Sequence, residues 1–135
     1  MPLYHYTCEH AIGHILRSGR VSPMATPGHL DQRLRAAGLP PSGLREPVCW
    51  LTDMKWPDAL ALGLQSRTLT CDRTLWRVSV DAPHAEAWRD FVQRVKPNPA
   101  WVRTLEFERK PRRWYVSERS LTIVAVKQMR QENPA

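Results

Sequence analysis

Long apolar runs are missing from this 135-residue sequence. No run approaches the roughly 18 residues that a membrane-spanning helix needs, and the N-terminus lacks a basic region followed by an apolar one. We therefore expect a chain that is neither inserted in a membrane nor exported by a recognisable signal. Internal repeats and low-complexity segments are also lacking. The length fits a single domain over residues 1–135, large enough to bury roughly two-thirds of its unfolded surface.

The chain has only three cysteines, and their spacing does not suggest a pair. Cys8, Cys49 and Cys71 are far apart and form no Cys-x-x-Cys motif, which favours a reducing compartment over a secreted disulfide scaffold. We therefore predict a cytoplasmic protein. Neither Cys49 nor Cys71 has an evident histidine partner in the sequence, so cysteine nucleophile chemistry has little support.

A metal site also has little support. The spacing of His5, Cys8, His10 and His14 superficially suits zinc. On a helical wheel, however, Cys8 faces the predicted core while His10 and His14 face the solvated side. We predict no metal.

Positive charge is in excess. Twenty Lys and Arg residues against 13 Asp and Glu give a formal net charge of +7, which attracts polyanions such as nucleic acid or a dinucleotide pyrophosphate. The arginines are spread along the chain, with one local cluster, Arg109-Lys110-Pro111-Arg112-Arg113. This cluster is either a solvated loop or a contact to phosphate or nucleic acid.

The first twenty residues predict a short strand followed by an amphipathic helix. Tyr4 and Tyr6 flank His5 in the strand, Thr7 is the expected N-cap, and Gly19 ends the helix. The predicted core face of this helix contains Cys8, Ile12, Ile15 and Leu16.

The rest of the chain mixes strands and helices, which indicates an α+β fold. Prolines interrupt residues 22–47, so we expect a long excursion that acts as a lid or binding loop, with one short helix over residues 29–37. We predict further helices over residues 57–64 and 83–95, the second with a core stripe of Trp88, Phe91, Val92 and Val95. The remaining strands are expected over residues 48–52, 75–80, 104–108, 113–117 and 121–128.

Taken in order, several of these motifs resemble the ADP-ribosyltransferase fold. They are Leu3-Tyr4-His5-Tyr6-Thr7, an Ile-x-x-Ile-Leu-x-x-Gly helix, the proline-rich excursion, a Val-x-Trp-Leu-Thr strand and a final Trp-Tyr-Val-Ser strand. The chain is most similar to small bacterial members and to DNA-modifying ADP-ribosyltransferase toxins, and the segment after Arg113 resembles the closing strands of poly-ADP-ribose polymerases. The resemblance implies a split antiparallel β-sheet core with short flanking helices, which grips NAD in a cleft.

The resemblance also implies roles for individual residues. His5 matches the histidine that binds the adenosine-side ribose, and Tyr6 and Thr7 match positions that meet the nicotinamide amide. Trp50 and Thr52 match the second strand, which lies near the nicotinamide. An aromatic ring there could stack on the nicotinamide and favour its loss, although Trp50 is equally compatible with ordinary core packing.

Two arginines and one further tryptophan complete the predicted NAD-binding residues. Arg73 and Arg77 could bind the pyrophosphate, because arginine meets phosphate oxygens through two parallel hydrogen bonds. Arg77 lies on the polar face of its predicted strand, so a surface salt bridge is the alternative. Trp114 belongs to the closing strand of the resemblance.

The sequence departs from the family pattern at the expected catalytic carboxylate. The family usually has a glutamate immediately before the aromatic residue of the last strand, and this chain has Arg113 there. We predict that His5 acts with Glu118 or Glu108, and Glu106 also lies nearby. The alternatives are that these glutamates are solvated, that the transfer chemistry is altered, or that the chain binds NAD or ADP-ribose without catalysis.

The resulting prediction is an NAD-dependent ADP-ribosyltransferase, which is a kind of glycosyltransferase. A toxin is one candidate role for such an enzyme. The enzyme would cleave the nicotinamide–ribose bond and transfer ADP-ribose to a macromolecular acceptor, protein or nucleic acid. The alternative is a non-enzymatic nucleic-acid-binding or protein-interaction module, based on the +7 charge, the Arg109–Arg113 cluster, and Trp101 and Trp114 as stacking residues.

Overall fold

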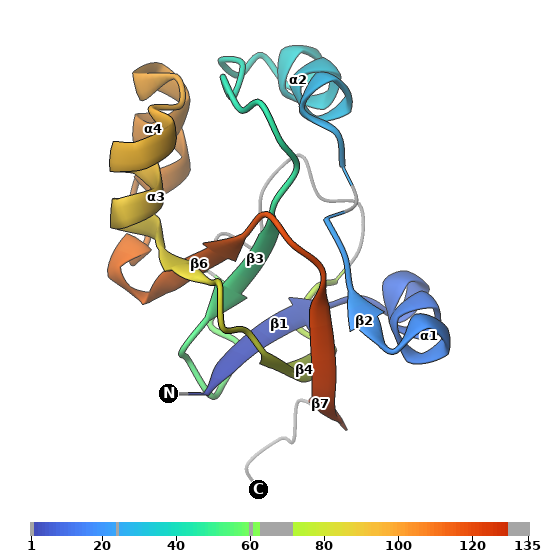
Figure 1. The fold of residues 1–135 in the computed structure, drawn as a ribbon. Coiled ribbons are helices and arrows are strands. Elements are labelled where there is room, and N and C mark those ends of the chain that lie inside the picture. The colour runs from blue at the N-terminus through green and yellow to red at the C-terminus, as the bar shows by residue number, and fades with distance from the viewer. Residues whose placement is uncertain (1, 24, 60, 63–71, 130–135) are drawn as a thin grey trace, which may run out of the picture.

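An antiparallel sheet runs through the computed structural model, which describes residues 2–23, 25–59, 61–62 and 72–129. In this part of the chain, seven strands form one sheet in the order β2-β7-β4-β1-β3-β6-β5 (Figure 1). The strands are β1 (Leu3–Thr7), β2 (Arg20–Val21), β3 (Cys49–Thr52), β4 (Trp76–Asp81), β5 (Glu86–Ala87), β6 (Trp114–Ser117) and β7 (Leu121–Gln128).

The helices flank the sheet in two pairs. In the view of Figure 1, α3 and α4 stand on one side of β3, and α1 and α2 lie on the other side. Their bounds are α1 (Glu9–Ser18), α2 (Pro27–Ala36), α3 (Trp88–Val95) and α4 (Pro99–Glu106), with a 3-10 helix η1 (Pro111–Arg113) before β6. The predicted α+β class with an antiparallel sheet is therefore confirmed.

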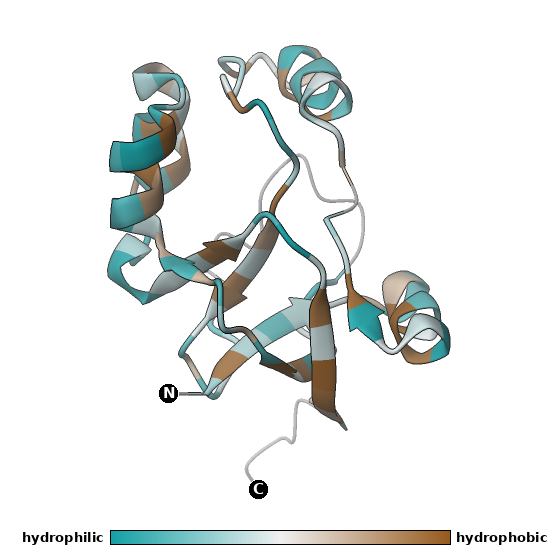
Figure 2. Cartoon of the chain, viewed as in Figure 1, coloured by the Kyte–Doolittle hydropathy of each residue, from teal (hydrophilic) through white to brown (hydrophobic). Residues whose placement is uncertain are grey.

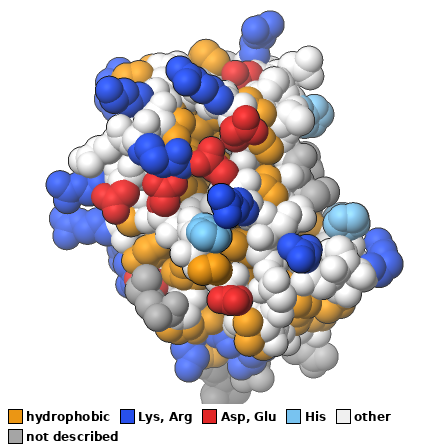
Figure 3. All heavy atoms as spheres, viewed as in Figure 1, with side chains coloured by type: hydrophobic (Ala, Val, Ile, Leu, Met, Phe, Trp, Pro, Cys, Tyr) orange, Lys and Arg blue, Asp and Glu red, His pale blue; other side chains and the backbone are white. Residues whose placement is uncertain are grey.

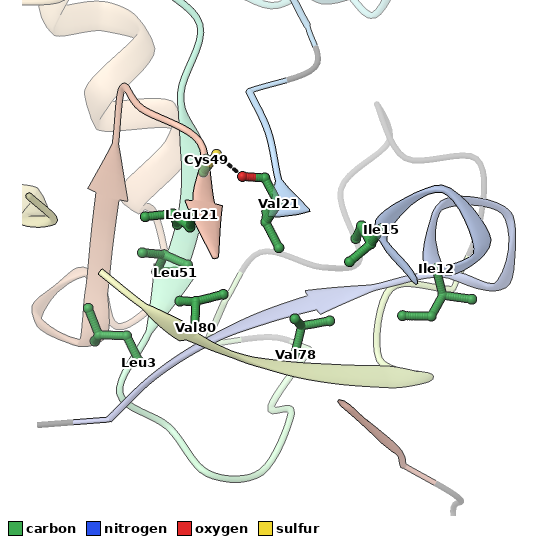
Figure 4. Close-up of a cluster of buried hydrophobic side chains, with 9 residues drawn as sticks. All are labelled: Leu3, Ile12, Ile15, Val21, Cys49, Leu51, Val78, Val80 and Leu121. Carbon is green, nitrogen blue, oxygen red and sulfur yellow. Dashed lines mark hydrogen bonds between the residues drawn. The ribbon is translucent and has the colours of Figure 1, made fainter. Parts of the chain in front are cut away.

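An aliphatic core lies between the sheet and α1. Strand side chains alternate between the two faces of a sheet, and Leu3, Leu51 and Val78 point to the face that α1 covers (Figure 4). Ile12 and Ile15 of α1 pack onto this face. The apolar stripe of an amphipathic helix thus covers one half of the sheet.

A second core, rich in tryptophan, lies under α3 and α4. Trp88 stacks on Phe91 at 5.6 Å and meets Trp101 and Trp114 edge-on at 6.0 and 5.9 Å. These geometries are the ones that aromatic quadrupoles favour. Figure 2 shows the corresponding apolar stripes along α3 and α4.

The two halves of the sheet meet at a narrow joint. On one side, β1 pairs with β4 along five residues, and on the other β3 pairs with β6 along four. Between β1 and β3 the described register contains a single pair, Tyr4 with Thr52. The sheet is continuous, but fewer registered residue pairs join β1 to β3 than join the strands on either side.

Most predicted elements occur close to their expected positions, but several differ in type or extent. The sequence predicts a strand over residues 104–108, but residues 104–106 form the end of α4 and residues 107–108 follow it. This helix begins at Pro99, after the Asn98 cap. The helix predicted from residue 83 begins only at Trp88, because β5 precedes it and pairs with β6.

The start of the first helix also differs. Thr7 is the last residue of β1 and is buried, and the N-cap is Cys8, without a side-chain cap hydrogen bond. Leu16, predicted to face the core, is 52% exposed. Of the helix predicted over residues 57–64, residues 57–59 and 61–62 contain no helix and the rest lie outside the described residues.

The proline-rich excursion is anchored to the N-terminus of α4. The backbone N–H of Asn98 donates to the carbonyl of Ser42 at 2.9 Å, and the Asn98 side chain donates to the carbonyl of Pro41 at 2.8 Å. Gly43 has a φ of 70° beside this contact. A Cβ at residue 43 would lie 2.7 Å from the Asn98 nitrogen, so glycine is required there.

Within the described residues, none of the helices has the length and apolar character needed to cross a bilayer.

Candidate functional site

The site begins where β1 and β3 separate. Beyond Tyr4, the residues of β1 have registered partners only in β4. The imidazole of His5 reaches across to β3, where its Nδ1–H donates a 2.8 Å hydrogen bond to the backbone carbonyl of Trp50. A side chain therefore satisfies a strand carbonyl that lies past the end of the backbone ladder.

The surroundings of His5 keep it neutral. Burial lowers the pKa of the imidazole, the nearby charge of Arg73 lowers it further, and the hydrogen bond to Trp50 acts in the opposite direction. Burial has the largest effect of the three, because it disfavours the charged form. With the proton on Nδ1, the Nε2 atom carries a lone pair that can accept a hydrogen bond from a ligand hydroxyl.

A cleft of about 940 Å³ opens at this gap, within the roughly 300–1,000 Å³ typical of small-molecule sites. Residues of β1, β3, α1, α2 and α4 line it. Its basic lining residues are His5, His10, His14, Arg20, His29, Arg33, Arg73 and Arg109. Among the described lining residues there is no aspartate or glutamate, so the cleft favours an anionic ligand.

Two of the cleft arginines have unsatisfied donors. The Nε atoms of Arg33 and Arg73 are shielded from solvent and have no hydrogen-bond partner. A third, Arg109, donates from Nη1 to the carbonyl of Leu105 at 2.8 Å, and burial lowers its pKa. A shielded donor without an acceptor is costly, and a bound anion would supply acceptors to the Nε atoms of Arg33 and Arg73.

The tryptophans predicted at the site have mainly structural roles. Trp50 is half-buried and lines the cleft, but its ring also packs on Trp88 at 5.1 Å and on Trp114 at 6.1 Å. Trp114 is 4% exposed and donates from Nε1 to the Ala61 carbonyl at 3.0 Å. Trp50 thus combines the core role and the lining role that the sequence left open.

Tyr6, Thr7 and Thr52 all line the cleft. The Tyr6 hydroxyl donates to the Met54 carbonyl at 2.7 Å, and burial raises its pKa to about 12. Thr52 is buried, and its hydroxyl donates to the carbonyl of Arg113 at 2.7 Å. These three residues therefore form the floor of the cleft with most of their side-chain polar groups already bonded to protein.

The predicted catalytic glutamates lie elsewhere. Glu118 forms an ion pair with Arg94, which also pairs with Glu86, and lies in a smaller hollow beside Phe91. Glu108 is exposed, with a φ of 57° in the turn after α4. The structure therefore brings His5 to the cleft without either glutamate.

Two predicted arginine positions also lie outside the described lining. Arg77 packs over the Tyr4 ring at 5.0 Å and donates to the Lys55 carbonyl at 2.6 Å. Arg113, which stands where the family has its glutamate, pairs with Asp53. Both arginines therefore bind residues of the turn after β3, and neither lines the cleft.

Sequence reasoning missed several cleft residues on the two nearest helices. The helical wheel places His10 and His14 on the solvated side of α1, and the predicted binding residues include neither His29 nor Arg33 of α2. They do lie on exposed or half-buried faces, but the cleft opens onto those same faces. The i, i+4 spacing of basic residues on each helix was the available signal.

Cysteine and metal chemistry gain no geometric support. The Cys49 thiol lines the cleft, but burial raises its pKa to about 12. It donates weakly to the carbonyls of Val21, the contact drawn in Figure 4, and Arg119. In the described part of the chain, no three His, Cys, Asp or Glu residues are grouped so that they could hold a metal ion.

Comparisons of the chain with protein-family models, with curated proteins and with solved structures gave no match.

Proposed function

We propose that the chain is an NAD-dependent ADP-ribosyltransferase that binds NAD in the cleft between β1 and β3. The observation that carries the proposal is the neutral His5, whose Nδ1–H is fixed by the Trp50 carbonyl and whose Nε2 is left to accept a hydrogen bond. A ribose hydroxyl is a suitable donor for this atom. The role matches the one that the resemblance implies for His5.

The main chain of β1 supports the nicotinamide end of this proposal. Tyr6 and Thr7 have strand partners in β4 but none in β3 among the described pairs. Main-chain groups on the β3 side of β1 are therefore positioned to meet the amide of nicotinamide. The half-buried ring of Trp50 lines the same cleft and offers an aromatic surface.

The charge of the lining supports the pyrophosphate end. Arg73 lies close enough to His5 for its charge to lower the histidine pKa, and its Nε has no protein partner. A pyrophosphate bound next to the ribose would supply an acceptor to this guanidinium.

The proposed reaction breaks the bond between nicotinamide N1 and ribose C1′. The bond electrons leave with neutral nicotinamide, C1′ forms a bond to a nucleophile of the acceptor, and the acceptor proton is released to water. Positive charge develops on the ribose in such a reaction, and the described lining supplies no carboxylate to balance it. We therefore propose slower transfer than in a cleft that has the family glutamate.

The two tryptophans that the nucleic-acid-binding alternative requires for base stacking are buried. Trp101 and Trp114 are 3% and 4% exposed and belong to the tryptophan core, so neither can stack on bases. What remains for this alternative is the net charge and the exposed cations near η1.

The test is calorimetric titration of NAD into the purified protein, together with nicotinamide release in the presence of single-stranded DNA, RNA or cell lysate. His5→Asn replaces the donor to Trp50 but removes the Nε2 acceptor, so we expect at least about tenfold weaker NAD binding. His84→Asn is the matched control, because His84 is exposed and outside the cleft lining. Unchanged NAD affinity in folded His5→Asn protein would refute the proposed site.

A further inference from the structure

Two helices present paired basic residues to the same cleft. The pairs are His10 and His14 on α1 and His29 and Arg33 on α2, each separated by four residues and therefore on one helix face. Arg20, the first residue of β2, lines the cleft directly after α1. We refer to these five residues as the basic wall.

Acidic residues do not neutralise the basic wall from its own helices. Glu9 of α1 accepts a 2.7 Å hydrogen bond from Trp76 Nε1, and Asp31 of α2 accepts one of 2.8 Å from the Ser42 backbone. Neither residue lines the cleft. In the view of Figure 3, the right-hand side shows Lys, Arg and His, while the acidic side chains of this face lie toward the centre and left.

Arg33 has a side-chain donor that is free to bind a ligand. Its Nε is shielded from solvent and has no hydrogen-bond partner. Most buried donors in folded proteins are paired, and the cleft that Arg33 lines supplies the space for an acceptor. An anion bound in the cleft would supply this acceptor.

The basic wall is distinct from the positive charge that the proposed NAD site requires. The pyrophosphate was assigned to Arg73, whose charge is felt by His5 on β1, whereas the basic wall stands on α1, β2 and α2. NAD carries one net negative charge, because the charged nicotinamide ring offsets one of the two pyrophosphate charges. A cleft with four arginines and four histidines in its described lining exceeds this need.

We infer that the basic wall binds a phosphate monoester in addition to the pyrophosphate. Such a group carries about −1.5 to −2 charges at pH 7 and three acceptor oxygens, which suits several cationic and imidazole donors that line the same cleft. This inference rests on the proposed NAD site. The phosphate belongs either to the dinucleotide, as a 2′-phosphate on its adenosine ribose, or to the end of a nucleotide acceptor.

The first arm of the test compares NAD and NADP by calorimetric titration. If the phosphate belongs to the dinucleotide, NADP should bind about tenfold more tightly than NAD. Arg33→Gln should remove this difference, while Arg33→Lys should keep part of it, because the charge is retained. Arg89→Gln, on the exposed face of α3 and outside the cleft, is the matched control.

The second arm compares one short single-stranded oligonucleotide with and without a 5′-terminal phosphate. If the phosphate belongs to an acceptor, the phosphorylated form should bind about tenfold more tightly, and Arg33→Gln should abolish the difference. Melting curves establish that each variant is folded. If the Arg33→Gln variant is not folded, the Arg20→Gln variant on β2 is used for the same comparison.

The outcomes separate this inference from the proposed function. An Arg33-dependent preference for the phosphorylated ligand in either arm supports the basic wall. If NAD binds but neither arm shows such a preference, the inference is overturned and the NAD site stands. If a phosphorylated ligand is preferred while NAD does not bind, the phosphate site stands and the proposed NAD function fails.

Discussion

His5 joins β3 to β1 and also faces the cleft, so the chemistry of this one side chain affects both stability and binding. Its hydrogen bond to the Trp50 carbonyl replaces a rung that the backbone ladder does not form. Loss of a buried hydrogen bond that leaves a carbonyl unsatisfied costs about 1–3 kcal/mol. His5→Ala should therefore lower the free energy of unfolding by that amount in addition to weakening NAD binding.

The lowered pKa of His5 predicts a pH dependence of stability. Since the folded-state pKa lies below the ordinary value of 6.5, the unfolded chain binds more protons as the pH falls below about 6.5, and unfolding becomes easier. Urea titrations at pH 7.5 and pH 5 should show this loss in the wild type. In His5→Asn the loss should be smaller, and an identical loss in both proteins would contradict the assignment.

At the residue level, the sequence predicted the cleft residues near strand ends better than those on helices. His5, Tyr6, Thr7, Trp50 and Thr52 follow one another in short motifs, and the structure places all five at the cleft. Arg33 and His14 could not be assigned in this way, because a solvated helix face and a cleft-lining face look alike in the sequence. Only the packing of α1 and α2 around the gap distinguishes them.

Among the elements, α4 shows why a local pattern can mislead. Leu105 and Phe107 alternate with Glu106 and Glu108, which is the pattern of a half-buried strand. The structure instead buries Trp101, with Leu105 packed one turn later against the same core. A helix starting at Pro99 places both side chains on the tryptophan core, and this gain overrides the local alternation.

The contact between the excursion and α4 predicts a specific effect at Gly43. Gly43→Ala would place a methyl group 2.7 Å from the Asn98 backbone nitrogen in a residue with a φ of 70°. We expect a loss of about 1–3 kcal/mol in the free energy of unfolding, measured by thermal or urea unfolding. Gly28→Ala is the matched control, because a Cβ there meets no atom within 4 Å; equal stability of the two variants would contradict this reading.

The charge of the whole molecule predicts salt-dependent binding. A net charge of +7 and a cleft lining without described carboxylates attract anionic ligands through a field that salt screens. NAD affinity should therefore fall about threefold or more between 50 and 300 mM NaCl. Calorimetric titration at the two salt concentrations measures this, and a constant affinity would contradict the electrostatic account of the cleft.

At the level of the whole fold, the mixed order of strands and helices in the sequence predicted the α+β class, and the antiparallel sheet was implied by the resemblance to the ADP-ribosyltransferase fold. Among the observed strands, clear alternation of apolar side chains was available only over residues 75–80, which contribute most of β4. The sequence could not predict that β2 pairs with β7, since a two-residue strand leaves no periodic signal. Nor could it predict that β1 and β3 share a single registered pair, because strand pairing between segments that are distant in the chain leaves no local signal in the sequence.

The link between His5 and the Trp50 carbonyl has an evolutionary consequence. A lineage that abandoned the ligand would still benefit from a donor at position 5, because this hydrogen bond satisfies a β3 carbonyl. The Nε atoms of Arg33 and Arg73, in contrast, bind no protein group. Among descendants of this chain, a retained histidine would accordingly record a preserved fold, and drift at the two arginines would record a lost ligand.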